Sequence, residues 1–251
     1  MRSIFRFKRF DVVNECSAMK VNTDGVLLGA VMNISPEDRR LLDVGTGTGT
    51  IALMAAQRLT QMVGDAFPDE AAVMFRVDAI DVDEPSAAEA AGNFGNSPWS
   101  DIMHAKHCSL ADFASRESGT YDLIFSNPPY FDSSLEAPQK RRNAARHTST
   151  GLSYREILDF SAVHLTSQGR VALVLPADNE RDLVRHARMC GLHLYRITRV
   201  RTVPRKIPSR IIAEFSRQRT ALPEDSLLTI QNEGQYTDEY LSLMKDFYLF
   251  A

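Results

Sequence analysis

The fold of this 251-residue chain is decided by the stretch Leu41-Leu42-Asp43-Val44-Gly45-Thr46-Gly47-Thr48-Gly49-Thr50-Ile51. Its apolar start predicts a buried strand, and its glycines predict a tight turn that leads into a helix and lets the backbone approach a ligand. A dinucleotide-binding loop would carry a third glycine where this chain has Thr50, and the lysine of a P-loop is absent. The stretch therefore predicts the first strand, turn and helix of an α/β sheet, with a ligand at the turn.

Short apolar runs alternate with helical patterns along the rest of the chain, which is typical of βαβ units on a parallel sheet. Residues 192–200 and 211–215 are joined without room for a helix, so they predict an antiparallel hairpin at one end of the sheet. We therefore expect a Rossmann-like α/β fold with a seven-stranded, mostly parallel sheet and helices on both faces. The expected strands begin near Leu41, Val73, Ile102, Tyr121, Val171, Leu192 and Ile211, and the expected helices near Thr50, Pro85, Leu110, Tyr154 and Asp178.

Asn127-Pro128-Pro129-Tyr130 follows the apolar segment 121–125, so it is expected at the carboxyl end of a strand, where open α/β sheets bind ligands. The Asn127 carboxamide oxygen and the Pro128 carbonyl can both accept hydrogen bonds, and Pro129 stiffens the backbone that carries them. Two fixed acceptors suit a planar –NH2 group, and Tyr130 would stack on a base. Alternatively, the four residues form only a proline turn after a strand.

A further candidate for the ligand site is an acid at the end of an expected strand. The segment Val77-Asp78-Ala79-Ile80-Asp81 reads as a strand that ends in Asp81, whose carboxylate can accept hydrogen bonds from both hydroxyls of a ribose. Val82 follows at the same strand end and is included in the expected cofactor site. Asp83 is the alternative acid, although we favour a role at the start of the next helix.

The bulk composition allows one large domain, which we place at residues 36–251 after an N-terminal extension, residues 1–35. The formal charge of −3 gives no global sign of nucleic-acid binding. Three cysteines without CxxC spacing favour neither a disulfide framework nor a zinc site, so we expect a cytoplasmic protein without a metal. No apolar run reaches the roughly 18 residues of a membrane helix. We expect a monomer.

Cations nevertheless gather in three parts of the chain, and together they could form one phosphate-binding surface or three separate solvated surfaces. One of them lies in a long insertion, residues 131–150, beside the Asn127 strand end, which predicts a substrate loop. The clusters are Arg2, Arg6, Lys8 and Arg9, interleaved with Phe5, Phe7 and Phe10; Lys140, Arg141, Arg142, Arg146 and His147; and Arg196, Arg199, Arg201, Arg205, Lys206 and Arg210.

The D-x-G-x-G-x-G pattern that starts at Asp43 resembles the first motif of class I S-adenosylmethionine-dependent methyltransferases. Residues 16–30, CSAMKVNTDGVLLGA, together with 96–99, 126–130 and 247–250, resemble the bacterial tRNA1(Val) adenine-37 N6-methyltransferases nearly end to end. The resemblance implies methyl transfer from S-adenosylmethionine to the exocyclic amine of an adenine beside the anticodon. It also implies that the N-terminal extension packs over the cofactor and substrate.

The resemblance further implies a set of site residues. In relatives, an aspartate that accepts a hydrogen bond from the adenine amine of the cofactor often stands where this chain has Ser109. Here the serine hydroxyl, or a backbone amide of Ser109 or Leu110, would have to replace that contact. The expected catalytic residues are Asn127, Pro128, Pro129 and Tyr130. The expected cofactor contacts are Lys20, Thr23, Asp24, Asp43, Gly45, Gly47, Gly49, Asp81, Val82, Ser109, Leu110 and Asn127. The expected contacts with the tRNA anticodon stem-loop are Phe5, Phe7, Lys8, Arg141, Arg142 and Arg146.

Three alternatives stay open at this point. Asn-Pro-Pro-Tyr also occurs in enzymes that methylate the glutamine amide of release factors, although these resemble a longer architecture with a separate helical domain. An rRNA or DNA base could be the acceptor instead. The third alternative is a non-catalytic RNA-binding protein on a methyltransferase scaffold, against which the intact Asp43, Asp81 and Asn127 argue.

Overall fold

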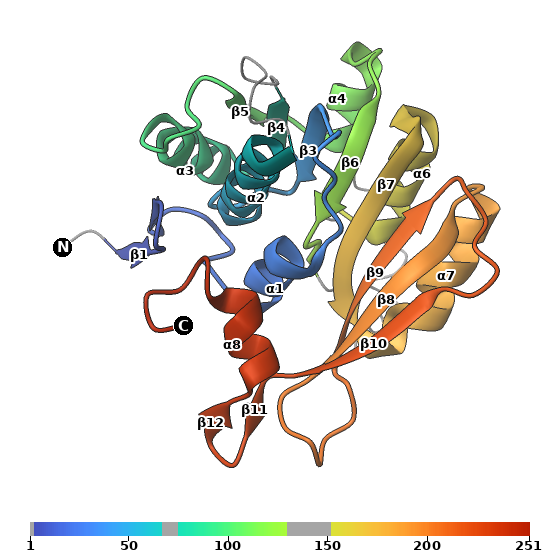
Figure 1. The fold of residues 1–251 in the computed structure, drawn as a ribbon. Coiled ribbons are helices and arrows are strands. Elements are labelled where there is room, and N and C mark those ends of the chain that lie inside the picture. The colour runs from blue at the N-terminus through green and yellow to red at the C-terminus, as the bar shows by residue number, and fades with distance from the viewer. Residues whose placement is uncertain (1–2, 67–74, 130–151) are drawn as a thin grey trace, which may run out of the picture.

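An eight-stranded sheet forms the centre of the computed structural model, which describes residues 3–66, 75–129 and 152–251 (Figure 1). The strand order is β10-β8-β9-β7-β6-β3-β4-β5, and β9 runs antiparallel to both of its neighbours while the other pairs are parallel. The strands are β3 (Arg40–Val44), β4 (Arg76–Asp81), β5 (Met103–His107), β6 (Tyr121–Ser126), β7 (Leu165–Pro176), β8 (His193–Arg201), β9 (Arg210–Ser216) and β10 (Glu224–Thr229).

The mostly parallel sheet and the β8–β9 hairpin confirm the fold expected from the sequence, but the expected number of seven strands is wrong. The additional strand is β10, whose sequence Glu-Asp-Ser-Leu-Leu-Thr lacks the β-branched or alternating pattern that signals a strand. It becomes a strand because it pairs with β8 at the sheet edge and buries Leu228, which is 3% exposed and lies opposite Val200. The expected strand start at Val73 lies outside the described residues.

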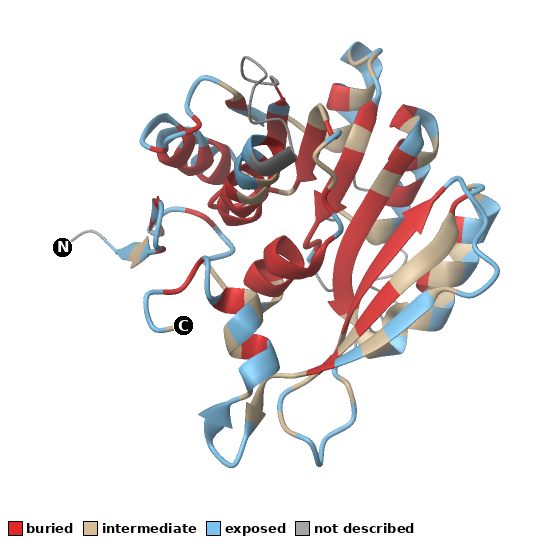
Figure 2. Cartoon of the chain, viewed as in Figure 1, coloured by how far each residue is buried: buried red, intermediate tan, exposed pale blue. Residues whose placement is uncertain are grey.

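The inner strands are buried on both faces, as β3, β6 and β7 show in Figure 2. Successive side chains of a strand point to opposite faces of the sheet. Along β3, Leu41 therefore belongs to one hydrophobic core and Leu42 to the other, and both side chains are fully buried. Burial on both faces is the usual environment of a parallel sheet covered by helices.

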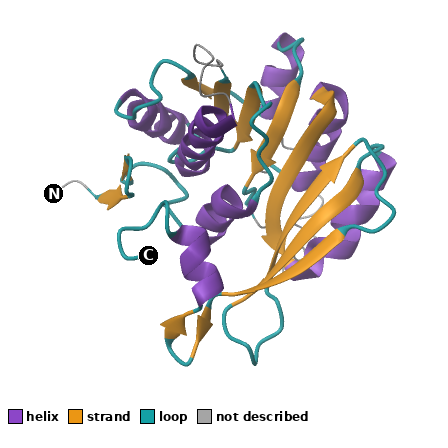
Figure 3. Cartoon of the chain, viewed as in Figure 1, coloured by secondary structure: helices purple, strands orange, loops and turns teal. Residues whose placement is uncertain are grey.

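Helices cover both faces of the sheet, as expected (Figure 3). Helices α1, α2 and α3 contribute to the core that contains Leu41, whereas α4, α6 and α7 contribute to the core that contains Leu42. The expected helix starts near Thr50, Leu110 and Tyr154 are confirmed. The helices are α1 (Thr23–Val31), α2 (Thr50–Ala66), α3 (Glu84–Gly95), α4 (Leu110–Arg116), α6 (Tyr154–His164), α7 (Glu180–Met189) and α8 (Asp238–Met244), with a 3-10 turn at Ala177–Asn179. Two small antiparallel pairs complete the fold: β1 (Ile4–Arg6) with β2 (Asp11–Val13), and β11 (Gln231–Asn232) with β12 (Gln235–Tyr236).

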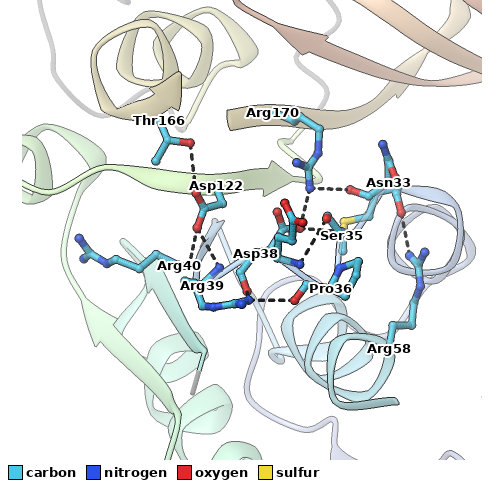
Figure 4. A network of polar contacts seen from close by, with 12 residues as sticks. Asn33, Ser35, Pro36, Asp38, Arg39, Arg40, Arg58, Asp122, Thr166 and Arg170 are labelled. Atoms are coloured by element: carbon cyan, nitrogen blue, oxygen red, sulfur yellow. Dashed lines mark hydrogen bonds and ion pairs between the residues drawn. The ribbon is translucent and has the colours of Figure 1, made fainter. Parts of the chain in front are cut away.

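The connection between α1 and β3 is fixed to the sheet by the half-buried Asp122 and the buried Asp38 (Figure 4). The carboxylate of Asp122 in β6 accepts the backbone N–H groups of Arg39 and Arg40 at 2.8 and 3.0 Å. Asp38 accepts a hydrogen bond from the Arg170 guanidinium in β7 at 2.5 Å. Helix α1 is thereby held against the central strands, although its residues belong to the part of the chain that we expected to be an extension.

Glu214 makes a further connection between α1 and the sheet, and it gives a test of these packing contacts. Its carboxylate is fully buried and accepts hydrogen bonds from the Asn33 N–H at 2.8 Å, the Tyr195 hydroxyl at 2.9 Å and the Arg196 guanidinium at 2.9 Å. Glu214→Gln removes the charge and turns one acceptor into a donor. We expect a loss of about 1–3 kcal/mol in the free energy of unfolding, measured by urea denaturation, because buried donors lose their partner.

Glu224→Gln is the matched control, because Glu224 is the exposed acid that faces the same Arg196 at 3.4 Å. An exposed ion pair contributes about 0–1 kcal/mol, so this variant should stay close to the wild type. Equal effects of the two substitutions would contradict the role given to Glu214.

Candidate active site

The candidate site lies at the carboxyl ends of β3, β4 and β6, where ligands bind in open α/β sheets. Three segments from different parts of the chain meet there: the glycine loop 45–49 after β3, the residues around the start of α1, and Asn127 after β6. A small pocket separates them. It is lined by residues 19–22, 25–26, 45–48, 50–51 and Asn127.

The glycine loop has the tight turn that the sequence predicted. Gly45, Gly47 and Gly49 have positive φ angles of 72°, 56° and 80°, a conformation that side chains with a Cβ rarely adopt. A Cβ at Gly49 would also lie 2.5 Å from the ring of Phe94 in α3. The loop therefore needs glycine both for its backbone conformation and for its close contact with the helix.

Asp81 at the end of β4 holds this loop in place. Its Oδ2 accepts the Gly47 N–H at 2.9 Å, and its Oδ1 accepts the Asp83 N–H at 2.9 Å. Asp83 in turn caps α3 by accepting the Ser86 N–H at 3.0 Å, so its expected role at the helix start is confirmed. Because each carboxylate oxygen has more than one lone pair, Asp81 can still accept hydrogen bonds from a ligand beside the loop.

Asp43 lies beneath the loop and is fully buried. Its Oδ2 accepts the Thr46 hydroxyl at 2.7 Å, whereas its Oδ1 has no hydrogen-bond partner within the described residues. Burial raises the pKa of Asp43 to about 7, the nearby charge of Asp81 adds to the increase, and the Thr46 hydrogen bond opposes it. A buried acceptor without a partner is costly, so this oxygen is suited to receive a donor from a ligand.

Asn127 reaches the pocket from the end of β6. The preceding Ser126 donates a hydrogen bond to the Val44 carbonyl at 2.6 Å and so fixes the end of β6 against the end of β3. The Asn127 side chain is 6% exposed, and its Nδ2 lies 3.4 Å from Asn22 Oδ1 and 3.4 Å from Met19 Sδ. Asn22 thus faces the nitrogen of the Asn127 carboxamide, and the carboxamide oxygen points the other way.

The remaining residues of the Asn127 motif differ in exposure. Pro128 is buried and Pro129 is exposed, while Tyr130 lies outside the described residues. Strand β6 ends at Ser126, and Asn127 and the two prolines come next, which agrees with the sequence prediction, because proline has no N–H to continue the ladder.

Residues 15–22 form a strap over the glycine loop, and its attachment was missed by the sequence reasoning. The buried carboxylate of Glu89 in α3 accepts the backbone N–H groups of Glu15, Cys16 and Ser17 at 2.8, 2.7 and 3.1 Å. Hydrogen bonds to an ionised acceptor are roughly twice as strong as those between neutral groups. Glu89 is therefore the main anchor of the strap.

The strap touches the glycine loop directly. A Cβ at Gly47 would lie 3.3 Å from both the Met19 carbonyl oxygen and the Ser17 hydroxyl, so only glycine leaves ordinary contact distances. Ser86 in α3 adds a second anchor by accepting the Ala18 N–H at 3.3 Å. Ser86, Glu89 and Asn93 recur at i, i+3 and i+7 on a helix rich in alanine, and this polar stripe was the signal available in the sequence.

Only one of the three expected cofactor residues near the start of α1 lies at the pocket. Lys20 lines the pocket, whereas Thr23 and Asp24 are not among its lining residues. Asn22 is the residue that caps the helix, by accepting the Gly25 N–H at 2.9 Å. Asp24 accepts a hydrogen bond from Arg210 Nε at 2.8 Å, which joins α1 to β9.

Val82, Ser109 and Leu110 lie at the ends of β4 and β5 and do not line this pocket. Val82 is 60% exposed. The Ser109 hydroxyl caps α4: it accepts the Asp112 N–H at 3.0 Å and donates to the Asp112 carboxylate at 2.7 Å. The structure therefore gives this serine a role at the helix start, and its hydroxyl proton is already used.

The aromatic residues near the N-terminus pack inward. Phe7 is 4% exposed and stacks on Phe10 and Tyr248, with ring centroids 4.5 and 6.0 Å apart. The expectation that Phe7 contacts RNA is corrected, because a ring this buried offers no face to a base. Lys8 is exposed, but its ammonium donates to the Lys245 and Ala251 carbonyls. Phe5 is half-buried beside Phe7.

Three further expectations concern the arginines of the insertion, a membrane helix and a metal site. Arg141, Arg142 and Arg146 lie outside the described residues. No helix in the described part of the chain is long and apolar enough to cross a membrane. The potential metal ligands that converge in the described ranges are Asp159 on α6, His186 on α7 and Cys190 just after α7.

Comparison with protein families gives a match to the RMKL-like methyltransferase domain over residues 33–200. The tRNA1(Val) (adenine(37)-N6)-methyltransferase of Parabacteroides distasonis is 41% identical over 246 residues, which cover 98% of this chain and 97% of that protein. The protein of the same name from Porphyromonas gingivalis is 40% identical over 256 residues, with 98% of this chain and 94% of that protein covered.

Two solved structures with the same fold carry methyltransferase names. A predicted O-methyltransferase from Agrobacterium tumefaciens superposes with a TM-score of 0.59 at 14% identity, over 89% of this chain and 96% of that one. A 16S rRNA methyltransferase from T. thermophilus, in complex with AdoMet and guanosine, gives a TM-score of 0.54 at 17% identity, over 86% of this chain and 50% of that one. At these identities the likeness concerns the fold, and it confirms the expected class I methyltransferase architecture.

Glu89→Gln tests the anchoring of the strap. The substitution places an –NH2 donor where backbone N–H groups need an acceptor, so the strap should detach locally while the sheet stays folded. Loss of such partners costs about 1–3 kcal/mol. Amide hydrogen exchange at residues 15–17 should therefore accelerate by roughly 5- to 150-fold, with exchange in β3 unchanged. Glu84→Gln, an exposed acid in the same helix, should leave the strap protected; equal protection in both variants would contradict the anchor.

Asp43 gives a pH-dependence that can be measured on the protein alone. Because its pKa in the folded state is raised to about 7 from 3.8, its contribution to stability is complete below about pH 4 and is lost as the pH rises to about 7. Asp43→Asn removes this titration. Relative to that variant, the unfolding free energy of the wild type should fall between about pH 4 and 7 and then level off. A constant difference across this range in urea denaturation would contradict the raised pKa.

Proposed function

Because the chain belongs to the tRNA1(Val) (adenine(37)-N6)-methyltransferase family, we propose that it transfers the methyl group of S-adenosylmethionine to the N6 amine of adenine 37 in tRNA1(Val). The observation that carries this proposal is that the glycine loop, which Asp81 holds through the Gly47 N–H, and Asn127 meet around one pocket. The first two suit the methyl donor, and the third suits the amine that accepts the methyl group.

The residues around the loop fit S-adenosylmethionine in their chemistry. The Asp43 Oδ1 without a partner can receive a donor from the cofactor, and the half-buried Asp81 has lone pairs for ribose hydroxyls. The cofactor contacts that we propose are Lys20, Thr23, Asp24, Asp43, Gly45, Gly47, Gly49, Asp81, Val82, Ser109, Leu110 and Asn127. When bound, S-adenosylmethionine supplies a methyl carbon made electrophilic by the adjacent sulfonium.

The strap has to move for the cofactor to enter. The pocket between strap and loop measures about 30 Å³. S-adenosylmethionine is many times larger, so Met19 and its neighbours move outward during binding. Since Glu89 anchors residues 15–17, Ser86 holds Ala18 and Asn22 caps α1, we place the movement in residues 19–21.

Asn127 and the Pro128 carbonyl are the proposed acceptors for the two protons of the adenine amine. An exocyclic amine is a poor nucleophile because its lone pair is delocalised into the ring, and two acceptors draw electron density back to nitrogen. The same contacts strengthen as the nitrogen becomes positive in the transition state. Asn22 faces the Nδ2 of Asn127 and so presents the carboxamide oxygen, rather than the nitrogen, to the amine. Tyr130 is proposed to stack on the base.

The acceptor base is accessible because an anticodon loop is single-stranded, so turning the base outward costs less than in a duplex. Orienting the amine in line with the methyl group supplies much of the rate increase, of the order of 7–11 kcal/mol for well-placed reactants. We propose that Arg141, Arg142 and Arg146 in the insertion 131–150 hold the tRNA backbone beside the pocket. The reaction belongs in the cytoplasm, where tRNA is found.

Asn127→Ala tests the proposed chemistry. Removing one preorganised group that stabilises transition-state charge typically lowers turnover about 10²–10³-fold. We expect a loss of that size in methyl transfer from labelled S-adenosylmethionine to tRNA from cells that lack this gene, with cofactor affinity largely kept. Asn232→Ala, an exposed asparagine in β11, is the control and should remain active. Near-normal turnover in Asn127→Ala would contradict the role of this residue.

Mapping the modified nucleoside in the same assay tests the acceptor. The wild-type protein should produce N6-methyladenosine at position 37. N2-methylguanosine, or no label in RNA, would overturn the proposed function.

A further inference from the structure

We propose that the tip of the β8–β9 hairpin, residues 202–209, binds the phosphate backbone of the tRNA, an inference that rests on the proposed function. Because β8 is parallel to β7, the hairpin turns at the carboxyl edge of the sheet, the edge that carries the candidate active site. The register fixes this: Arg210 at the start of β9 lies opposite both Val200 in β8 and Pro176 at the end of β7. Figure 1 shows the tip as an orange loop beyond the ends of these strands.

The base of the hairpin is connected to the candidate site through α1. Arg210 Nε donates to Asp24 in the first turn of that helix at 2.8 Å, and Asn22, which caps the helix, faces Asn127. Strand β9 is separated from β6 only by β7. At about 4.8 Å per strand spacing, its start lies roughly 10 Å to the side of the end of β6. A nucleic acid whose base enters the pocket would therefore pass beside the tip.

Most cations of this part of the chain are already neutralised or bonded, which the sequence could not show. Arg196 pairs with Glu214 and Glu224, and Arg199 pairs with Glu180 and Asp225. Arg201 donates to the Thr229 hydroxyl and the Pro204 carbonyl, and Arg210 pairs with Asp24. These arginines hold β8, β9 and β10 together, and their charges are largely compensated.

Arg205 and Lys206 differ from the other four cations of the cluster. Both are exposed, and neither makes an ion pair or a side-chain hydrogen bond within the described residues. They are adjacent at the tip of the hairpin. Two uncompensated cations at the edge where the substrate is bound form the kind of contact through which proteins position RNA by its phosphates.

The tip is also held in shape. Ser209 donates its N–H to the Val200 carbonyl at 2.9 Å, and the Lys206 N–H bonds the Val203 carbonyl at 3.0 Å in a turn between two prolines. A rigid tip loses little conformational freedom on binding. Ile207 is 85% exposed beside the two cations, so it can contact a ribose or base next to the bound phosphate.

Charge reversal with a matched control tests the proposal. The test variant is R205E/K206E, and the control is R188E/R219E. Arg188 and Arg219 are likewise exposed, border one shallow hollow, and lie at the opposite edge of the sheet, near the start of β8 and the end of β9. Binding of unmodified tRNA1(Val) transcript is measured by fluorescence anisotropy between 50 and 200 mM salt. Methyl transfer and S-adenosylmethionine binding are measured in parallel.

We expect R205E/K206E to raise Kd and KM for tRNA at least about tenfold. The plot of log K against log salt should also become less steep by about 1–2, because each lost phosphate contact reduces the magnitude of its slope by about 0.7–0.9. Affinity for S-adenosylmethionine should not change, and R188E/R219E should bind tRNA within about twofold of wild type. The neutral variant R205Q/K206Q should show the same fall in slope with a smaller rise in Kd.

An unchanged Kd and salt slope in R205E/K206E, with the wild type active on tRNA, would overturn the proposal and leave the proposed function intact. Equal losses in R188E/R219E would also overturn it, because the effect would then follow net charge and not position. Absence of tRNA methylation by the wild type would overturn the proposed function and this proposal together.

Discussion

The buried carboxylate of Glu89 is the interaction on which the site depends. It gathers three consecutive backbone N–H groups of the strap, and the same helix supplies the Phe94 ring against Gly49. One helix therefore positions both walls of the pocket. Without this anchor, Met19 and Lys20 would be held beside the glycine loop only through Ser86 on one side and the cap of α1 on the other.

The parts of the site that could be predicted from sequence are those whose cause is local. Glycines with positive φ, an acid at a strand end and an Asn-Pro pair after a buried strand each depend on a few adjacent residues, and all were placed correctly at the carboxyl edge. Strand β10 was missed because it depends on pairing with β8, not on its own pattern. Phe7 was misjudged because its burial depends on Tyr248, at the other end of the sequence.

Charge was the hardest property to predict for the same reason. The uninterrupted series of cations in the sequence left open a phosphate-binding surface or a solvated one, but the acids that neutralise Arg196, Arg199 and Arg210 come from α1, from the start of α7 and from β9 and β10. Sequence neighbours on a strand alternate in direction and meet different partners. A mildly acidic protein can thus use most of its arginines to join its own strands and leave a few cations for an external partner.

The packing of the two chain ends has a consequence for how the protein is made. Phe7 stacks on Tyr248, and the Lys8 ammonium bonds the carbonyls of Lys245 and Ala251. Phe7 and Lys8 therefore cannot make these contacts until residues 245–251 have been synthesised. During synthesis the strands from β3 to β7 can pair while Phe7 and Lys8 still lack these partners, so part of the sheet can form before the two segments pack together.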